Sequence, residues 1–507
     1  NSLPHGITEL RSTRGTSSHQ HNPFVILADK DTTESTGECY SASFLYSGGF
    51  HAQAEVDQFN QTRLVIGIDD YDFSWKLKKG ESFSTPEVCL TYSADGFSKL
   101  SQTLHQAIVS NLIRSCWKDR VRPILVNNWE ATYFDFNKDN LIAIAKEAAE
   151  LNLDMLVLDD GWFGKRDDDF SGLGDWFVNE KKLCGTLSEL VKEVHDMGLS
   201  FGLWFEPEMI SEDSDLYRAH PDWALVIPGR QPIRSRSQLV LDMSREDVTD
   251  YLTERICDIV EKADIQYIKW DMNRSLMAAY SAKLPRDRQG ELRHRYVLGL
   301  YKVLEAVTQR FPELLLEGCS GGGGRFDAGM LYYCPQIWCS DNTDAIERLR
   351  IQYGTSFGYP MSSVSAHVSV CPNHQNHRVT PFKTRGICAM QGTFGYELDL
   401  SKMTDEEKKM AGEQIAFFKE HGRLFQFGDY YRLTSPFENR DYTVWEYAAQ
   451  DGSEACMSVV YTDMYANAAS EIVKWKGLDP KKVYQMQLDG EDAGNFSGAA
   501  LMHAGIL

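Results

Sequence analysis

The feature that most constrains this chain is a regular alternation of strand and helix patterns from about residue 122 to about residue 370. We predict barrel strands at 123–126, 155–158, 201–204, 239–241, 266–270, 314–316, 336–339 and, with the weakest pattern, 362–370. Strand and helix alternating about eight times over roughly 300 residues predicts a (β/α)₈ TIM barrel. A doubly wound sheet also alternates, but it does not need polar residues at the end of nearly every strand.

Acidic residues stand at the predicted ends of these strands, with tryptophans beside them. The carboxylates are Asp159, Asp160, Glu206, Asp242, Asp271, Glu317 and Asp341, and the tryptophans are Trp129, Trp162, Trp204, Trp270 and Trp338. Carboxylates accept hydrogen bonds from sugar hydroxyls, aromatic rings cover apolar sugar faces, and two opposed carboxylates suffice for glycoside hydrolysis. Any single one could instead cap the following helix, an alternative that suits Asp242 and Glu317.

The segment Tyr267–Arg274 is where we expect the chemistry. A lysine, an aspartate and an arginine crowd the end of a short buried strand. Lys269 beside Asp271 would favour the ionised carboxylate, and an ionised carboxylate can act as a nucleophile. A solvated salt bridge at an ordinary strand end is the alternative.

The barrel is expected to be flanked by β-structure. We place an N-terminal β-sandwich domain, partial in extent, at 1–96, a linking helix at 97–118, the catalytic barrel at 119–422 and a C-terminal antiparallel β-domain at 423–507. The last helix is predicted over 404–421, with a Thr404/Glu407 capping box, before Gly422.

Composition excludes several classes of function. The formal net charge of −21 argues against nucleic-acid binding. No apolar run reaches the length of a membrane span, and no signal peptide is visible, although the chain begins at Asn1 without a methionine. Eleven cysteines without a C-x-x-C pair indicate reduced core thiols and a cytoplasmic protein.

The signals for a metal site or a phosphate-binding site are weak. His374 and His377 lie in a polar loop without a partner motif, so we expect no metal and no cofactor. The glycines at 321–324 lack the spacing of a phosphate-binding loop, and close approach of the backbone to a ligand is the better interpretation. The acidic run Asp167–Asp169 is interpreted as a solvated loop.

Five ordered segments carry a family resemblance. Leu158–Asp169, Gly202–Met209, Tyr267–Arg274, Cys319–Asp327 and Ser340–Ala345 resemble the α-galactosidases of glycoside hydrolase family 36, and the resemblance runs from about residue 40 to beyond residue 420. It implies a retaining exo-acting hydrolase of terminal α-galactosides such as melibiose and raffinose, working by double displacement. A galactosyl transferase of the raffinose-synthase type and a non-catalytic galactoside-binding protein are the alternatives.

The resemblance also assigns roles to residues. It implies that Asp271 is the nucleophile, that Asp341 is the acid/base and that Asp159 and Asp160 bind galactose. Further sugar contacts carry over to Trp129, Trp204, Arg236, Lys269, Cys319, Gly322 and Trp338, and the loop with Cys319 and Gly322 is expected to face the 2-position of the sugar.

Two departures from the family pattern bear on these expectations. Asn342 stands where the family more often has a second Asp, and loss of that charge would lower the pKa of Asp341 if the two are close. The N-terminal β-domain of the family is longer, and in its tetramers part of that domain reaches a neighbouring active site. We therefore interpret the chain as N-terminally truncated, with a homo-oligomer as the assembly that the resemblance implies.

Overall fold

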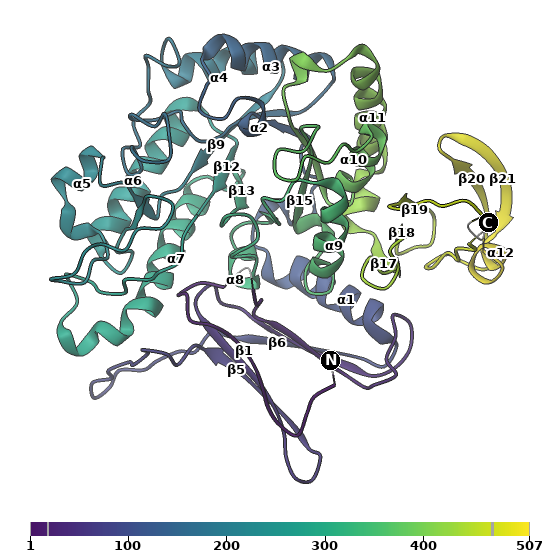
Figure 1. Ribbon diagram of the computed structural model, residues 1–507, viewed down its shortest axis with the longest axis horizontal. Helices are drawn as coiled ribbons and strands as arrows, with labels where there is room; N and C mark the ends of the chain where they lie inside the picture. The colour runs from purple at the N-terminus through teal and green to yellow at the C-terminus, as the bar shows by residue number, and fades with distance from the viewer. Residues whose placement is uncertain (1, 18–19, 468–470, 506–507) are drawn as a thin grey trace.

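The computed structural model describes residues 2–17, 20–467 and 471–505. Its centre is a closed parallel barrel in which β16 pairs with β7 to complete the ring (Figure 1). The barrel strands are β7 (Leu125–Asn127), β8 (Met155–Leu158), β9 (Ser200–Phe205), β12 (Tyr267–Trp270), β13 (Leu315–Gly318), β14 (Gln336–Trp338), β15 (Val364–Ser369) and β16 (Thr393–Glu397). The predicted fold class, a TIM barrel with flanking β-structure, is confirmed.

Helices surround the barrel and connect its strands (Figure 1). They are α2 (Trp129–Thr132), α3 (Lys138–Glu150), α4 (Leu187–His195), α5 (Asp215–Ala219), α6 (Glu246–Ala263), α7 (Leu292–Arg310), α8 (Ala328–Leu331), α9 (Ala345–Thr355), α10 (Phe382–Ala389) and α11 (Asp405–Phe427). Side-chain caps fix several helix starts, as predicted for α3, where the Asn137 side chain accepts from the Asn140 N–H.

One predicted barrel strand is wrong, and one barrel strand was missed. The segment predicted at 239–241 forms β11 (Leu239–Val240), which pairs antiparallel with β10 (Met209–Ile210) outside the barrel. The strand predicted at 362–370 is confirmed as β15, and the strand that was missed is β16, which completes the ring as the eighth. Asp271 therefore follows the fourth barrel strand and Asp341 the sixth, whereas the sequence pattern placed them after the fifth and seventh. An apolar run of three residues is buried equally well in a two-stranded ribbon, and its pattern does not identify its partner.

Asp242 and Glu317 therefore do not belong to the barrel mouth. Asp242 is buried and accepts hydrogen bonds from the Ser244 N–H and from the Ser281 hydroxyl. Glu317 points into the barrel interior, where it accepts from Gln336 (2.7 Å) and Ser365 (2.6 Å). Both carboxylates support the local structure.

The lower part of the barrel interior is filled by apolar side chains. Leu125, Met155, Val157, Tyr267 and Leu315 form one buried cluster. A side chain at Gly202 would come within 2.6 Å of the Tyr267 ring, so a glycine is required there for the interior to close. The lower part of the barrel is thus a packed core and not a pore.

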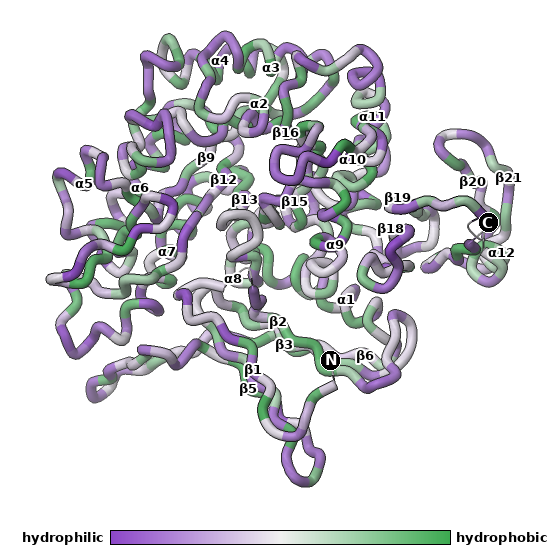
Figure 2. Tube along the Cα trace, viewed as in Figure 1, coloured by the Kyte–Doolittle hydropathy of each residue, from purple (hydrophilic) through white to green (hydrophobic). Residues whose placement is uncertain are grey.

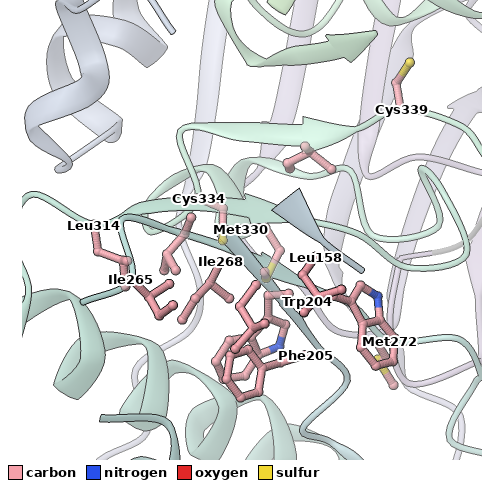
Figure 3. Close-up of a cluster of buried hydrophobic side chains, with 14 of the residues drawn as sticks. Leu158, Trp204, Phe205, Ile265, Ile268, Met272, Leu314, Met330, Cys334 and Cys339 are labelled. Carbon is pink, nitrogen blue, oxygen red and sulfur yellow. The ribbon is translucent and has the colours of Figure 1, made fainter. Parts of the chain in front are cut away.

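A larger cluster lies between the strands and the outer helices. Figure 3 shows part of it, with Trp204 and Phe205 at the end of β9 close to Met272, the residue after Asp271. Trp204, Phe205 and Met272 are at most 3% exposed. Close packing on both sides of Asp271 fixes the backbone that carries it.

The N-terminal part consists of two three-stranded antiparallel sheets. One has the order β1-β4-β5, from β1 (Gly6–Ser12), β4 (Phe50–Val56) and β5 (Thr62–Ile68), and the other has the order β2-β3-β6, from β2 (Phe24–Ala28), β3 (Cys39–Phe44) and β6 (Val88–Ser93). Phe44 and Phe50, from different sheets, share one buried cluster with Val297 of α7. The helix α1 (Gly96–Ala107) follows and continues as a π-helical turn (Ile108–Leu112).

The C-terminal part begins later than the helix pattern indicated. The helix predicted to end at 421 continues as α11 to Phe427, so the proposed boundary at 422/423 lies inside it. Gly422 stays helical because Leu424, Phe425 and Gln426 beyond it are buried against the protein. Three strands follow in a sheet, β17 (Asp429–Thr434), β18 (Tyr442–Ala448) and β19 (Ala455–Tyr461), and then a hairpin of β20 (Val483–Leu488) and β21 (Glu491–Ser497) with α12 (Gly498–His503).

The hairpin lies farthest from the barrel, at the right of Figure 1. Figure 2 shows hydrophilic and hydrophobic residues interspersed along the chain trace. No helix among the described residues is both long and apolar enough to span a bilayer. All eleven cysteines lie in the described ranges, and their thiols are free.

Candidate active site

The two-residue period of the strands determines which side chains face the barrel axis. On β12, Tyr267 points into the interior cluster. Lys269 and Asp271 lie two and four residues further along the chain, so their side chains point in the same direction, nearer the carboxyl end of the strand. The same logic brings Asp159 inward two residues after Val157 on β8. Chain positions more than a hundred residues apart thus meet at one end of the barrel.

Asp271 is buried and surrounded by hydrogen-bond donors. One carboxylate oxygen accepts from the Trp204 indole (3.2 Å) and from the Asn273 amide (2.7 Å). The other accepts from the backbone N–H of Met272 (2.8 Å) and of Gly321 (3.4 Å). Four donors around one carboxylate fix its orientation.

Asp341 has a different environment. The residue is solvent-exposed, and its carboxylate accepts from the Trp338 indole at 3.1 Å. Burial by the surrounding protein and the negative charge of Asp271 raise the pKa of Asp341, whereas Lys269 and Arg236 act in the opposite direction. A carboxyl group whose pKa is raised retains its proton to higher pH, as a general acid requires.

The glycine-rich loop after β13 lies between these two carboxylates. Gly321 donates its N–H to Asp271, and an added Cβ at Gly322 would come within 2.5 Å of the Asp341 backbone nitrogen. Gly322 also has a φ of +81°, which favours glycine. Cys319, at the start of the loop, is buried. Its burial is the main cause that raises the pKa of its thiol, and the negative charges of Asp271 and Asp341 raise it further.

Lys269 makes its direct contact with Asp159. Its ammonium lies 2.9 Å from the carboxylate, whose same oxygen also accepts from the Asn127 amide at 2.6 Å. Burial alone would lower the pKa of Lys269, but the neighbouring acidic groups, Asp159 first, raise it. We expected Lys269 to act mainly on Asp271; that carboxylate contributes less to the pKa of the lysine than Asp159 does.

Asp160 pairs with Arg166 and is largely buried. Both of its oxygens accept from the guanidinium, with Nη2 at 2.8 Å, and the exposed fractions of the two side chains are 7% and 2%. Burial raises the pKa of Asp160 to about 6 in spite of the arginine. Asp159 and Asp160 are adjacent, and Asp159 also accepts from the Asp160 N–H.

Two further predicted contacts, Trp129 and Arg236, lie near the surface. Trp129 begins α2 and is partly buried, with its ring edge-on to Tyr133 and to Phe134. Arg236 has a positive φ of 49° and a half-exposed side chain that lies 3.9 Å from Asp169. Asp169 therefore contacts Arg236 and is not merely solvated.

A second group of polar residues, not predicted from the sequence, lies next to Trp338. His367 packs on the Trp338 ring at 4.6 Å and lies 3.4 Å from Glu397 at the end of β16. The negative charge of Glu397 and, above all, burial raise the pKa of Glu130 on α2. The segment Thr393–Glu397 ends in a carboxylate like the recognised strands, so the signal for Glu397 was present.

Glu206 is the remaining strand-end carboxylate. It is buried and accepts from the Gln238 amide at 2.6 Å and from the Asn273 N–H. Burial, with a contribution from Asp271, raises the pKa of Glu206. Within the described ranges, no three His, Cys, Asp or Glu side chains are arranged to hold a metal ion.

The fold and the site together define a class: a (β/α)₈-barrel enzyme with carboxylates assembled at the carboxyl ends of its strands. Comparisons with known sequences narrow this class. The chain matches the Glycosyl hydrolase family 36 N-terminal domain over residues 1–78, Melibiase over 82–428 and the Glycosyl hydrolase family 36 C-terminal domain over 442–507. The chain belongs to glycoside hydrolase family 36, and the predicted family and enzyme class are confirmed.

Relatives share the sequence along nearly the whole chain. It is 55% identical to the bifunctional α-galactosidase/sucrose kinase AgaSK of Mediterraneibacter gnavus over 99% of this chain and 53% of that protein. It is 53% identical to the α-galactosidase AgaA of Geobacillus stearothermophilus over 99% of this chain and 68% of that enzyme. This chain thus spans about half the length of AgaSK and about two thirds of AgaA.

Solved structures agree with the fold. The crystal structure of AgaA superposes with a TM-score of 0.97 at 52% identity, covering 99% of this chain and 70% of AgaA. An AgaA variant solved in complex with raffinose has the same TM-score, identity and coverage.

Proposed function

We propose that this chain hydrolyses terminal, non-reducing α-D-galactosides with retention of the anomeric configuration. The observation that carries the proposal is the contrast between Asp271, held by four donors, and Asp341, whose pKa is raised. Two carboxylates in such different environments suit the two roles of a retaining glycosidase. The naming of the relatives as α-galactosidases supports the choice of sugar.

The proposed reaction is a double displacement. Asp271 attacks the anomeric carbon while Asp341 donates its proton to the glycosidic oxygen, so that the leaving sugar departs as an alcohol. The galactosyl ester on Asp271 is then hydrolysed by water, whose proton returns to Asp341. The first step leaves Asp341 ionised, which is the form that accepts the proton of water in the second step. The second step leaves Asp341 protonated, ready for the next substrate.

Sugar recognition is proposed for the other residues around the pocket. Asp159 and Asp160 accept hydrogen bonds from hydroxyl groups, with Lys269 orienting Asp159. Trp129, Trp204 and Trp338 cover apolar sugar faces, and Arg236 closes the rim. Cys319 and Gly322 face the 2-position, where the cysteine side chain leaves little room for an acetamido group.

A panel of α-linked sugars tests the proposal, with the first-formed anomer followed by NMR. We expect melibiose and raffinose to release α-galactose first, and α-N-acetylgalactosaminides to react far more slowly. Equal rates on both sugar classes would contradict the placement of Cys319 and Gly322. Transfer of galactose in excess of hydrolysis would identify a transferase, and retained galactose binding without turnover would identify a binding protein.

The assembly and the cellular location are also proposals. We propose a homo-oligomer, from the family resemblance, and a cytoplasmic location, supported by the free thiols. Sedimentation analysis of the purified chain tests the first, and localisation of the tagged protein in its host tests the second.

A further inference from the structure

The position of Asp341 depends on the backbone that carries it. Asp341 follows β14 and precedes α9 (Ala345–Thr355), in a short segment without regular secondary structure. A proton donor must stay within hydrogen-bond reach of the glycosidic oxygen, so a small displacement of this segment matters. The contacts that hold the segment come from two other loops.

Thr343, two residues after Asp341, is the centre of these contacts. Its buried hydroxyl donates to Glu130 Oε1 at 2.7 Å and accepts from the Asn373 amide at 3.0 Å. Its carbonyl accepts from the Ser369 hydroxyl at 2.9 Å. Thr343 thereby connects the segments that follow β7, β14 and β15.

A second contact reaches Asp341 itself. Gln375, in the loop after β15, accepts from the Thr343 N–H at 3.2 Å and donates its amide to the Asp341 carbonyl. The side chain of Gln375 is exposed, so its role does not include filling the core. Backbone groups on both sides of Asn342 are therefore held by one glutamine.

Glu130 is buried on α2, next to Trp129. Its two oxygens accept from Thr343 and, at 3.3 Å, from the Val370 N–H. Burial and the charge of Glu397 raise its pKa, which favours the protonated form. A buried carboxyl group is costly without such partners, so its contacts specify where Thr343 lies.

We propose that Glu130 and Thr343 are positioning residues for Asp341, which set the acid/base against the leaving-group oxygen. The inference rests on the proposed function and adds residues to it. Neither side chain needs to touch the sugar. Loss of the contact should therefore impair proton donation and leave nucleophilic attack by Asp271 nearly intact.

Leaving groups of different basicity separate these two effects. The sugar alcohol released from melibiose needs a proton as it departs, whereas 2,4-dinitrophenolate is a weak base that departs without one. A misplaced acid thus slows the first substrate selectively. General loss of structure slows both substrates alike.

The test compares kcat/KM on melibiose and on 2,4-dinitrophenyl α-galactoside. Thr343→Val, which removes the hydroxyl at constant shape, is expected to lose roughly 100-fold on melibiose, within the range for general acid catalysis, and less than about 3-fold on the aryl substrate. Thr343→Ser should restore most of the melibiose activity. Glu130→Gln should show a smaller split in the same direction.

Glu446→Gln is the matched control, because Glu446 is also a buried carboxyl with a raised pKa, to about 8, and it accepts from the Lys476 N–H in the C-terminal part. It should leave both substrates unchanged. If Thr343→Val does not fold, Gln375→Ala at the exposed site must show the split. Equal losses on both substrates, or no loss, would overturn the inference, and a wild-type chain inactive on both would overturn the proposed function itself.

Discussion

The ends of β12 and β14 carry the same side chain in two different settings. Asp271 is 6% exposed and receives four hydrogen bonds, two of them from backbone N–H groups. Asp341 is solvent-exposed, and desolvation of its carboxyl by the neighbouring protein, together with the charge of Asp271, raises its pKa. The difference teaches that neighbours, not residue type, separate a proposed nucleophile from a proposed acid.

The glycine loop after β13 maintains this difference. It supplies a donor to Asp271 and packs against the backbone of Asp341 without a side chain at Gly322. Loss of the Gly321 donor, or addition of a side chain at Gly322, should make the environments of Asp271 and Asp341 more alike. The following changes test the contrast, beginning with the largest expected effect.

Asp271→Asn should remove nearly all turnover, by roughly 10⁴-fold or more, because an amide cannot form the glycosyl ester. The amide has nearly the shape of the carboxylate and keeps one accepting oxygen, so we expect the fold and galactose binding to persist. Steady-state kinetics on an aryl α-galactoside and calorimetric binding of galactose check both points. Residual activity of more than a few per cent would remove Asp271 from its proposed role.

Gly322→Ala should lower kcat/KM by roughly 100-fold, because the new Cβ would displace the backbone of Asp341. Strain at a φ of +81° adds a stability loss of about 1–3 kcal/mol. Gly229→Ala is the matched control, since Gly229 has a φ of +76° and nothing lies within 4 Å of its added Cβ. Equal activity losses in the two variants would show that the loop does not separate the carboxylates.

Arg236→Gln should move the basic limb of the pH profile of kcat/KM to higher pH. The glycosylation step needs protonated Asp341, so activity is lost as pH rises through the pKa of that group. The positive charge of Arg236 lowers this pKa, and its removal raises it. Because Arg236 is half-exposed, the shift should shrink at high ionic strength; a shift to lower pH would contradict the assignment.

Asn342→Asp should have the smallest effect. Asn342 accepts from the Asp344 N–H, and its substitution restores the residue more usual in the family. A new negative charge next to Asp341 should move the basic limb slightly to higher pH and leave stability within about 0.5 kcal/mol. The pH profile and a thermal melt measure this, and a downward shift would show that the two side chains do not interact as like charges.

The expected effect of Asn342 is only one contribution to the pKa of Asp341. It concerns the difference between Asn and Asp at this position, whereas the raised pKa of Asp341 results mainly from burial and from Asp271. The sign of a pKa shift is set by all groups around the carboxylate, most of which come from other strands. A motif of six residues does not contain them.

Much of the molecule was predictable because its signals are local. The strand–helix alternation, the Asn137 and Thr404 caps, and the carboxylates after β8, β9, β12 and β14 all appear as short patterns in the chain. The family resemblance marked Gly322 as a sugar contact, and its positive φ is the physical reason why a glycine stands there. The period of two then directs Lys269 and Asp271 inward without further information.

Only the tertiary structure decided which segments meet. It excluded 239–241 from the barrel, closed the ring with Thr393–Glu397, continued α11 past Gly422, and paired Lys269 with Asp159. It also brought Glu130 to Thr343, 213 positions away. Sequence patterns record the preference of each segment for a conformation, whereas partner choice and burial are set by packing between segments far apart in the chain.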